Sequence, residues 1–458
     1  MFSSENIVTL AYPANRGRTR WHSKGACNAF ATLAFAALPF RRATARMGGV
    51  MVLAATSVDI ASVAVAPAHV ALLTIFHVLA QCLAILCGLG AILGIVYTAV
   101  ACWLIGRFFA RDVAAPQRFP AVTIVKPLHG DEWRLQAHLA SFFEQDYPGP
   151  VQYLFGVHDA CDAALAAVES LRTRYPGAHV TVVADARLYG PNRKIANLVN
   201  MLEKAEHEVL CFADSDVCVE PNYLRHIVGT LQQPGVGLVT TVYRGRPAPG
   251  FWPRLAAALT NYHFLPGVVT GLALGRARPC FGQSIAMTRE MLERIGGLAQ
   301  FAHHLAEDHA VGQAVRRAGA TVAIPPIVVE HACAENTFSK VFAHELRWSR
   351  TIRAADRSGH LGAVLMHPLP LALLAAAMSG GALSAWVLAG VALCARTLLV
   401  WRTDRATGKK CSGLLCLPLW DAAQFAIYVA SFCSSGVVWR GTRFRVDANG
   451  MLSPVHDK

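Results

Sequence analysis

The sequence predicts an α/β domain that is flanked on both sides by apolar helices long enough to cross a membrane. Short apolar runs alternate with helix-like segments between residues 118 and 330, a pattern typical of a parallel sheet with helices on both faces. Only 16% of the 458 residues are charged and 54% are hydrophobic, whereas soluble domains carry about 25% charged residues. Acidic clusters also follow two of the predicted strands, at the edge where such sheets bind ligands.

The N-terminal part contains a predicted leader and a membrane region. Residues 1–46 are poor in acidic residues and rich in Arg, Ser and Ala, which is typical of a targeting segment. Residues 47–110 form the predicted N-terminal membrane region. Its most secure span lies near Cys82–Ile105, because about 20 apolar residues cross a bilayer. Arg107 and Arg111 follow this span, and basic flanks favour a cytoplasmic location for the next domain.

A soluble domain is predicted for residues 118–355. Its expected strands are 122–125, 153–157, 179–183 and 209–213, with helices at 131–145 and 194–204. Residues 250–275 are apolar but interrupted by polar residues. We therefore expect an interface helix or a groove wall there rather than a span.

The C-terminal membrane region, residues 361–438, contains three apolar stretches: 361–378, 382–400 and 414–438. Arg396 lies near the end of the second stretch, where we expect its guanidinium to reach the membrane interface. The tail, residues 439–458, begins with basic residues. Three C-terminal crossings would place this tail on the non-cytoplasmic side, against the usual charge bias. Either one of the three stretches is re-entrant, or the number of membrane crossings differs from three by one.

The tripeptide Asp214-Ser215-Asp216 directly follows an apolar strand. Two carboxylates in this arrangement can hold one divalent ion together with a diphosphate, because Mg²⁺ prefers few protein carboxylates plus phosphate oxygens. A solvated turn is the alternative. The position after a strand favours a metal site at Asp214 and Asp216.

Two further polar clusters suit a nucleotide. Asp159 and Asp162 follow another strand, where a carboxylate can bind uracil or ribose by hydrogen bonds; capping of the next helix by Asp159 is the alternative. Lys194 stands on a loop that enters a helix, a place that suits phosphate. A solvated basic loop is the alternative there.

The remaining candidates lie near the end of the soluble domain. Glu307 and Asp308 begin a helix-like segment, and Asp308 is the candidate general base; acids that stabilise the helix dipole are the alternative. Arg347 can bind a diphosphate with two hydrogen bonds, and Trp348 can cover an apolar substrate. With His344 they also fit an amphipathic interface helix.

Composition excludes some classes of protein. The net charge is +13 and the pI about 9.3, which in a membrane protein reflects basic flanks and anionic lipid. We expect no nucleic-acid partner, because no nucleic-acid-binding motif is present. The 13 cysteines form no CxxC pair, which indicates reduced thiols rather than a disulfide framework.

Several motifs occur in an order that resembles a known family. They are VKPLHG, FFEQDYPG, VHDACD, PNRKIANL, FADSDV, LAEDHAVG and HELRW. The chain from about 120 to 450 resembles the ceramide glucosyltransferase family, glycosyltransferase family 21, and is most similar to the bacterial hopanoid-associated members. The resemblance implies a Rossmann-like GT-A domain flanked by transmembrane helices.

The same resemblance assigns roles to residues. It makes Asp162 and Asp214 the first two family aspartates and Asp308 the catalytic base, and it matches Arg347 and Trp348 to the end of the (Q/R)xxRW motif. His344 departs from the family, which has Gln or Arg there, so its role and that of Glu307 stay open. Asp216 stands where ceramide enzymes can lack an acid.

The resemblance implies an inverting, non-processive transfer from a UDP-sugar to a lipid, with a divalent cation, Mg or Mn. For the hopanoid branch the sugar is N-acetylglucosamine and the acceptor bacteriohopanetetrol; a ceramide glucosyltransferase is the alternative. A processive polysaccharide synthase shares the aspartates but usually has more spans. A membrane scaffold is another alternative, but it gives no role to the acidic residues that follow the strands. A transferase-like module without activity is also an alternative, but it gives no role to the three family aspartates. The Ala- and Arg-rich composition suggests a multi-pass protein of the bacterial inner membrane with a cytoplasmic catalytic domain.

Overall fold

The computed structural model describes residues 60–410, 413–433, 436–439, 442–446 and 452–454. The chain divides into two compact units, residues 1–67 and 68–458, and all contacts given below lie within the second unit. The predicted leader, residues 1–46, lies outside the described residues, as does much of the predicted tail.

The main sheet is built from apolar runs that the sequence places at regular intervals. Its strands are β1 (Val122–Pro127), β2 (Val151–Val157), β3 (His179–Ala184), β4 (Val209–Ala213), β6 (Val236–Thr240), β8 (Ser284–Thr288) and β9 (Thr321–Ala323). Among the described residues their order is β3-β2-β1-β4-β8-β6-β9. The first four are parallel, but β8 runs antiparallel to both β4 and β6. The expected parallel pairing holds for β1 to β4, whereas β8 makes the sheet as a whole mixed.

Two smaller sheets follow. One contains β5 (Val217–Cys218), β10 (Val328–Cys333) and β7 (Val242–Pro247), and the other β11 (Gly436–Trp439), β12 (Thr442–Val446) and β13 (Leu452–Pro454). In the first, β10 is parallel to β7 and antiparallel to β5. The short strand β5 begins one residue after Asp216, so this sheet extends the site-bearing edge of the main sheet.

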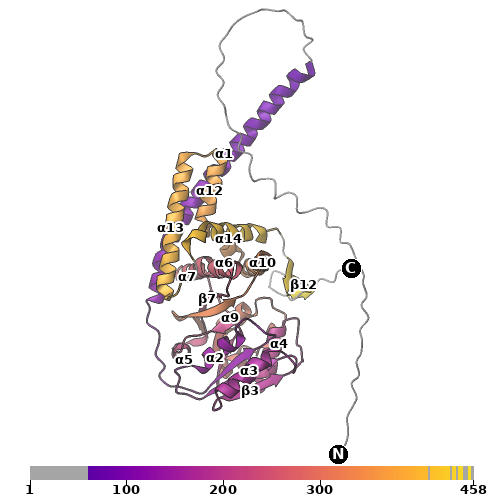
Figure 1. The fold of residues 1–458 in the computed structure, drawn as a ribbon, viewed down its shortest axis with the longest axis vertical. Helices are drawn as coiled ribbons and strands as arrows, with labels where there is room; N and C mark the ends of the chain where they lie inside the picture. The colour runs from indigo at the N-terminus through magenta and orange to yellow at the C-terminus, as the bar shows by residue number, and fades with distance from the viewer. Residues whose placement is uncertain (1–59, 411–412, 434–435, 440–441, 447–451, 455–458) are drawn as a thin grey trace, which may run out of the picture. The chain divides into compact units, whose positions relative to one another are not determined.

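The helices before the C-terminal membrane region are α1 (Ile60–Phe109), α2 (Leu135–Phe143), α3 (Ala164–Arg174), α4 (Arg193–Leu202), α5 (Tyr223–Leu231), α6 (Phe251–Leu259), the π-helix η1 (Thr260–Phe264), α7 (Leu265–Ala273), α8 (Arg289–Arg294), η2 (Ala299–Phe301), α9 (Glu307–Arg317) and α10 (Phe338–Ala355). Those that follow are α11 (Arg357–Gly362), η3 (Ala363–Met366), α12 (Pro368–Met378), α13 (Leu383–Thr407), η4 (Leu414–Cys416) and α14 (Leu417–Ser431). Figure 1 shows α6, α7 and α10 between the main sheet and the apolar helices α12, α13 and α14.

Helix α4 illustrates how local chemistry fixes an element against the sheet. The Asn192 side chain accepts a hydrogen bond from the backbone N–H of Ile195. The N–H groups in the first turn of a helix have no partner within the helix, and this N-cap satisfies one of them. The amide of Asn197 donates to the carbonyl of Gly156 on β2 at 2.8 Å. The first contact starts the helix and the second holds it on the sheet, next to the strand ends.

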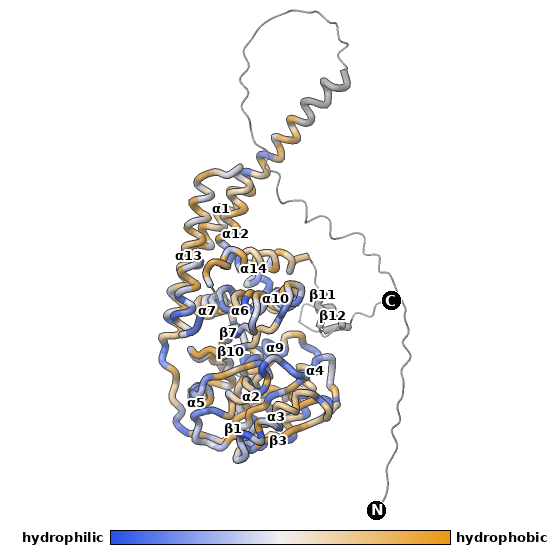
Figure 2. The backbone as a smooth tube through the Cα atoms, in the orientation of Figure 1, coloured by the Kyte–Doolittle hydropathy of each residue, from blue (hydrophilic) through white to orange (hydrophobic). Residues whose placement is uncertain are grey.

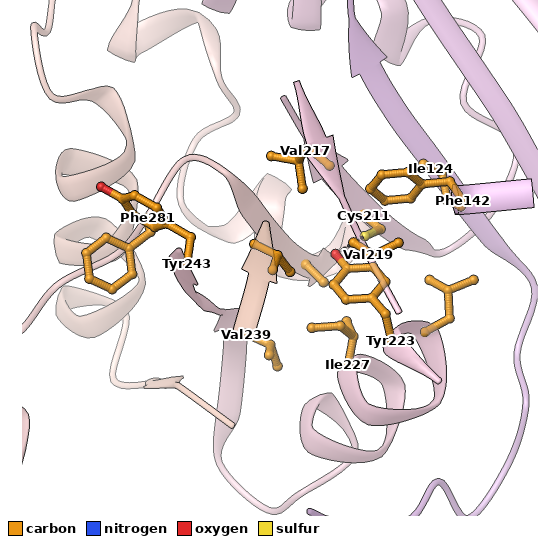
Figure 3. Close-up of a cluster of buried hydrophobic side chains, with 14 of the residues drawn as sticks. Ile124, Phe142, Cys211, Val217, Val219, Tyr223, Ile227, Val239, Tyr243 and Phe281 are labelled. Atoms are coloured by element: carbon orange, nitrogen blue, oxygen red, sulfur yellow. Dashed lines mark hydrogen bonds between the residues drawn. The ribbon is translucent and has the colours of Figure 1, made fainter. Parts of the chain in front are cut away.

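The core of the domain is apolar (Figure 3), and it includes a polar contact at Tyr223. The hydroxyl of Tyr223 on α5 lies 2.6 Å from Ser284 Oγ on β8 and 3.1 Å from Cys211 Sγ on β4. A buried hydroxyl without a partner is costly. The contact therefore fixes α5 beneath the junction of β4 with the antiparallel strand β8.

Three helices are long and apolar enough to cross a membrane within the described part of the chain: Val70–Phe109, Leu383–Thr407 and Leu414–Ser431. Figure 2 shows their apolar colouring. A fourth candidate is the pair Arg357–Met366 and Pro368–Met378, which is bent by 67° and has the form of a broken span or a re-entrant loop. The single arm expected at 361–378 is thus interrupted, because Pro368 starts a new helix and has no N–H to continue the old one.

Arg396 does not reach the interface, so that expectation is wrong. Its side chain is 2% exposed and donates to both carboxylate oxygens of Asp421, at 2.9 Å each. It also donates to the carbonyl of Tyr262 at 3.0 Å, and His263 Nε2 lies 2.9 Å from Asp421. A buried charge is tolerated only when it is paired, and this network joins α13 and α14 to the π-helix η1.

Candidate functional site

The predicted acidic residues gather at one edge of the main sheet because β2, β1 and β4 are parallel neighbours. Asp162 follows the end of β2 and Asp214 follows β4. Between them, at the end of β1, the buried Lys126 donates from Nζ to the carbonyl of Asp214 at 2.8 Å. Burial lowers the pKa of Lys126 to about 7, although Asp216 and Asp214 oppose the shift.

Asp162 is held in place by backbone donors. Its Oδ1 accepts hydrogen bonds from the N–H of Gly130 at 2.8 Å and of Ala164 at 2.9 Å, and His129 lies 3.3 Å from Oδ2. Burial alone would raise the pKa of Asp162, but these donors and His129 outweigh it and lower the pKa. The carboxylate is therefore ionised and fixed at the edge of the sheet.

Asp159 has a different setting. Its Oδ1 accepts from the N–H of Cys161 at 2.9 Å, on an exposed turn. Asp159 therefore closes a turn and does not cap the next helix, so that alternative is wrong; it is Asp162 that bonds to the first turn of α3. The structure does not bring Asp159 into contact with the other candidates.

Lys194 links two of the acidic clusters. Its Nζ lies 2.5 Å from Oδ1 of Asp214 and 3.6 Å from Oε1 of Glu307. Glu307 also accepts a hydrogen bond from the Asn192 side chain at 3.2 Å. Burial lowers the pKa of Lys194, but the neighbouring carboxylates of Asp214 and Glu307 outweigh it and raise the pKa. Lys194 therefore carries a permanent positive charge at the centre of the acidic cluster.

Asp308 lies beside this pair at the start of α9. Its Oδ2 accepts from the N–H of Gly282 at 2.8 Å and its Oδ1 from its neighbour His309 at 2.7 Å. Lys194, Gly282, Glu307 and Asp308 line one small pocket. Burial raises the pKa of Asp308, with Lys194 opposing the shift. A raised pKa suits a carboxylate that takes up a proton during a reaction.

Gly282 packs closely against Lys194 and Asp308. A Cβ atom there would lie 3.1 Å from Lys194 Nζ and 3.3 Å from Asp308 Oδ2. Both distances are tighter than ordinary van der Waals contact. A side chain at this position would require Lys194 and Asp308 to shift by a few tenths of an ångström.

Asp216 pairs with a histidine from the second sheet. His331 Nδ1 on β10 lies 3.0 Å from Asp216 Oδ2. Burial lowers the pKa of His331, but Asp216 outweighs it and raises the pKa to about 9. Burial would likewise raise the pKa of Asp216, and His331 holds it below its usual value. Asp216 is therefore ionised.

These carboxylates fit a divalent cation that takes its other ligands from a substrate. Oxygen ligands from one or two carboxylates plus phosphates suit Mg²⁺ and Mn²⁺, and Asp214 and Asp216 supply them. Within the described part of the chain, no group of three or more His, Cys, Asp or Glu side chains is arranged to hold a metal. A cation held by Asp214 and Asp216 would therefore take its remaining ligands from a substrate or from water.

An aromatic wall stands near Asp308: burial raises the pKa of Tyr243, a member of this wall, and the charge of Asp308 adds to the rise. The ring of Trp348 lies 5.7 Å from that of Tyr243 on β7, 6.1 Å from Phe264 and 5.9 Å from His331. Arg347 precedes Trp348 on α10 and is half-buried. Burial lowers the pKa of Arg347, with Glu307 opposing the shift. The Trp348 end of the predicted motif thus reaches the neighbourhood of the predicted base.

His344 lies one turn before Trp348, with ring centroids 4.9 Å apart, and its Nδ1 contacts Oε1 of Glu335. The loop before α10 supplies Glu335, between the end of β10 and the cap residue Thr337. His344 is therefore near the wall but is held by a residue outside the predicted set.

Sequence reasoning missed Lys126, Glu132, Gly282, His331 and Glu335. Glu132 accepts a hydrogen bond from Ser215 at 2.6 Å, and burial raises its pKa to about 7. Only Lys126 could have been found from the sequence pattern, because it is a charged residue directly after an apolar strand. The others reach the site through pairings between segments distant in the sequence.

The sequence model of the family described as Glycosyl transferase family 21 matches residues 86–452. The chain is 24% identical to ceramide glucosyltransferase 1 of Caenorhabditis elegans over 230 residues, which are 50% of this chain and 49% of the relative. It is 30% identical to the ceramide glucosyltransferase of Candida albicans over 124 residues, 25% of this chain and 23% of the relative. These matches span about half or less of the relatives' length.

Among solved structures, the chain resembles a mannosyltransferase from Pyrobaculum calidifontis in complex with GDP-mannose and Mn²⁺. The TM-score is 0.43 and the identity 20%, with 77% of this chain and 99% of the other covered. The family match carries the assignment, because it extends over most of the chain. The resemblance predicted from the motifs is confirmed: the protein is a glycosyltransferase and belongs to glycosyltransferase family 21.

Proposed function

We propose that this glycosyltransferase moves a sugar, N-acetylglucosamine, from a UDP-sugar to a hydroxyl group of a membrane lipid, a hopanoid such as bacteriohopanetetrol. The observation that carries the proposal is the position of Asp308: a half-buried carboxylate that lines a pocket beside the Lys194–Asp214 pair, near the aromatic wall of Tyr243 and Trp348. The helices that adjoin this wall, α6 and α10, pack on the apolar helix α14. A lipid hydroxyl can thus approach the base from the membrane side.

Asp308 acts as the general base in this proposal. Its carboxylate takes the proton of the lipid hydroxyl, and the oxygen then attacks the anomeric carbon of the sugar from the face opposite UDP. The bond from the anomeric carbon to the diphosphate oxygen breaks, and UDP leaves with that electron pair. One base and one leaving group on opposite faces give inversion at the anomeric carbon. Burial supports this role, because a raised pKa makes the carboxylate a better proton acceptor.

The nucleotide is assigned to the edge of the main sheet. Asp162 and Asp159 are proposed to bind the uridine, and Lys194, Asp214, Arg347 and Trp348 the diphosphate and the sugar. Asp214 and Asp216, with His331 beside them, would hold a divalent cation, Mg or Mn. When bound, the cation neutralises the charge of the leaving diphosphate. The roles of Glu307 and His344 are not needed for this step.

The proposed location is the bacterial inner membrane, with residues 47–110 and 361–438 as membrane regions and residues 118–355 as a cytoplasmic catalytic domain. Arg107 at the end of α1 and Arg405 in the last turn of α13 support this orientation, because basic residues concentrate on the cytoplasmic side. Lys409 follows α13 and pairs with Glu220 and Glu330 of the catalytic domain, which supports placing that end of α13 on the same side.

A ceramide acceptor is the second candidate, because the named relatives are ceramide glucosyltransferases. A lipid profile of cells with and without this protein separates the two. We expect glycosylated hopanoids to disappear without it and to return with the wild type but not with Asp308→Asn. Loss of a hexosylceramide instead would replace the acceptor and keep the chemistry. An unchanged glycolipid profile would contradict the lipid acceptor.

A further inference from the structure

Glu335 and His344 form a pair of side chains that the proposed reaction does not use. Oε1 of Glu335 contacts Nδ1 of His344, and the two side chains are only 16% and 22% exposed. Glu335 comes from the loop between β10 and α10, and His344 from the second turn of α10. The contact fixes the orientation of the imidazole ring, because a ring held at Nδ1 directs Nε2 to one place.

Each member of the pair has one buried polar atom that remains unused. Among the described residues, neither Oε2 of Glu335 nor Nε2 of His344 has a hydrogen-bond partner. Buried polar atoms are nearly always satisfied, and an exception requires an explanation. Because the two side chains touch, both atoms lie within the span of a single bound molecule. The pair is thus incomplete in the protein alone.

The pair borders the catalytic edge. The ring of His344 lies 4.9 Å from that of Trp348 and 6.4 Å from that of His331, which contacts Asp216. Residues three and four apart share one face of a helix, so His344 lies on the same face of α10 as Arg347 and Trp348. Both unused atoms are closed to solvent in the described structure, so a molecule that binds along this face reaches them only when the side chains around the pair move aside.

The chemistry of these atoms selects a hydroxyl group. Burial raises the pKa of Glu335, but His344 outweighs it and lowers the pKa, so the carboxylate is ionised and can only accept hydrogen bonds. A diphosphate offers no donor at neutral pH. A hydroxyl group donates to Oε2, and it donates to or accepts from Nε2 according to the protonation of the ring. A polyol thus satisfies both atoms.

We propose that Glu335 and His344 form a hydroxyl-binding subsite, in which Glu335 positions His344 and both contact a polyol. This inference rests on the proposed function, which supplies two polyols: the sugar of the donor and the head group of the lipid. At position 344 the family has Gln or Arg, which carry their own amide or guanidinium. Here the histidine needs Glu335 to hold it, so the pair acts as one unit.

The test uses the full-length protein in lipid nanodiscs with three variants: Glu335→Gln, His344→Gln and the double variant. Binding of UDP-N-acetylglucosamine and of UDP is measured by calorimetry without acceptor, and KM and kcat are measured with bacteriohopanetetrol. Because the pair acts as one unit, we expect the double variant to lose no more affinity than either single variant, about fivefold to tenfold for one lost hydrogen-bonding contact.

The two polyols give different results. If the sugar of the donor occupies the subsite, the affinity for UDP-N-acetylglucosamine falls while that for UDP stays. If the lipid head group occupies it, donor binding stays and KM for the polyol lipid rises, whereas a lipid with one hydroxyl is unaffected. Either result supports the subsite. Donor binding is read without transfer, so it remains informative if the wild type glycosylates no lipid.

The matched control is Glu206→Gln. Glu206 forms a similar but half-exposed pair with His179 at 3.4 Å, on a part of the domain away from the strand-end acids. We expect it to change no binding or kinetic constant. The subsite is overturned if donor affinity and both KM values of the three variants equal the wild type. It is also overturned if the two single losses add in the double variant, since the residues then act independently.

Discussion

The ammonium group of Lys194 lies 2.5 Å from a carboxylate oxygen of Asp214, which ties the start of helix α4 to the end of strand β4. The same ammonium lies 3.6 Å from Glu307, next to the candidate base. The Lys194 ammonium therefore acts on the carboxylates of Asp214, Glu307 and Asp308. Removing this charge should change the pKa of Asp308 through electrostatics, without the loss of a direct contact.

Lys194→Met should move the acid limb of the kcat/KM profile to higher pH. Asp308 must be ionised to accept a proton, so activity falls as the pH drops through its pKa. Lys194 opposes the rise in the pKa of Asp308 that burial causes. Without it the pKa rises further, and the fall in activity begins at a higher pH. Lys204→Met, at an exposed position, is the control. An acid limb that stays in place would show that Lys194 does not act on the base.

Removal of divalent cations should abolish transfer, and Mg²⁺ or Mn²⁺ should restore it. In Asp216→Asn the cation concentration for half-maximal activity should rise at least about tenfold, since even outer partners of a metal contribute that much. Activity is measured against cation concentration after chelation. Asp146→Asn, whose side chain is 71% exposed in a surface pair with Arg225, should behave as the wild type. Full activity in excess chelator would rule out the cation.

Glu345 should make the protein less stable as the pH rises. Burial, with a contribution from Glu335, raises its pKa in the folded state to about 8, whereas an exposed glutamate in the unfolded chain titrates at about 4.3. The folded state thus holds a proton that the unfolded state releases, and this stabilisation is lost between those two pH values. Glu345→Gln stays neutral and should reduce the fall in melting temperature by a few degrees, about the effect of 1 kcal/mol. Parallel melting curves for the two proteins from pH 5 to 8.5 would contradict this.

The buried pair of Arg396 and Asp421 should be costly to break and cheaper to replace. Arg396→Met leaves the Asp421 charge, 0% exposed, without its main partner, and such losses cost about 3–5 kcal/mol. Adding Asp421→Leu should recover much of the loss, because the uncompensated charge is gone. Thermal melting in the same nanodiscs measures both. If the double variant melts below Arg396→Met, the network contributes through something other than charge pairing.

The part of the site that sequence could predict is the part made by consecutive strands. Apolar runs predicted β1 to β4, and the parallel pairing of β2, β1 and β4 brings Asp162 and Asp214 to one edge as expected. His331 and Glu335 could not be predicted, because they reach the edge through β10, whose pairing with β5 and β7 depends on the tertiary fold.

Arg396 shows the same limit in the membrane region. Its position near the end of an apolar stretch predicted an interfacial guanidinium, since nothing in that stretch could pair with it. Its partner, Asp421, lies 25 residues later in another helix. Local hydropathy cannot distinguish a charge that reaches water from one that is neutralised by a distant helix.

Sugar transfer by the purified protein is the decisive measurement. Full-length protein in nanodiscs is given UDP-N-acetylglucosamine with a labelled sugar and either bacteriohopanetetrol or ceramide, and the lipid extract is analysed by mass spectrometry. We predict labelled glycosylated bacteriohopanetetrol with wild-type protein and a loss of about 10²–10⁴ in rate with Asp308→Asn, with donor binding retained. If no sugar reaches either lipid, or if Asp308→Asn transfers as fast as the wild type, the account of a lipid glycosyltransferase with Asp308 as its base is contradicted.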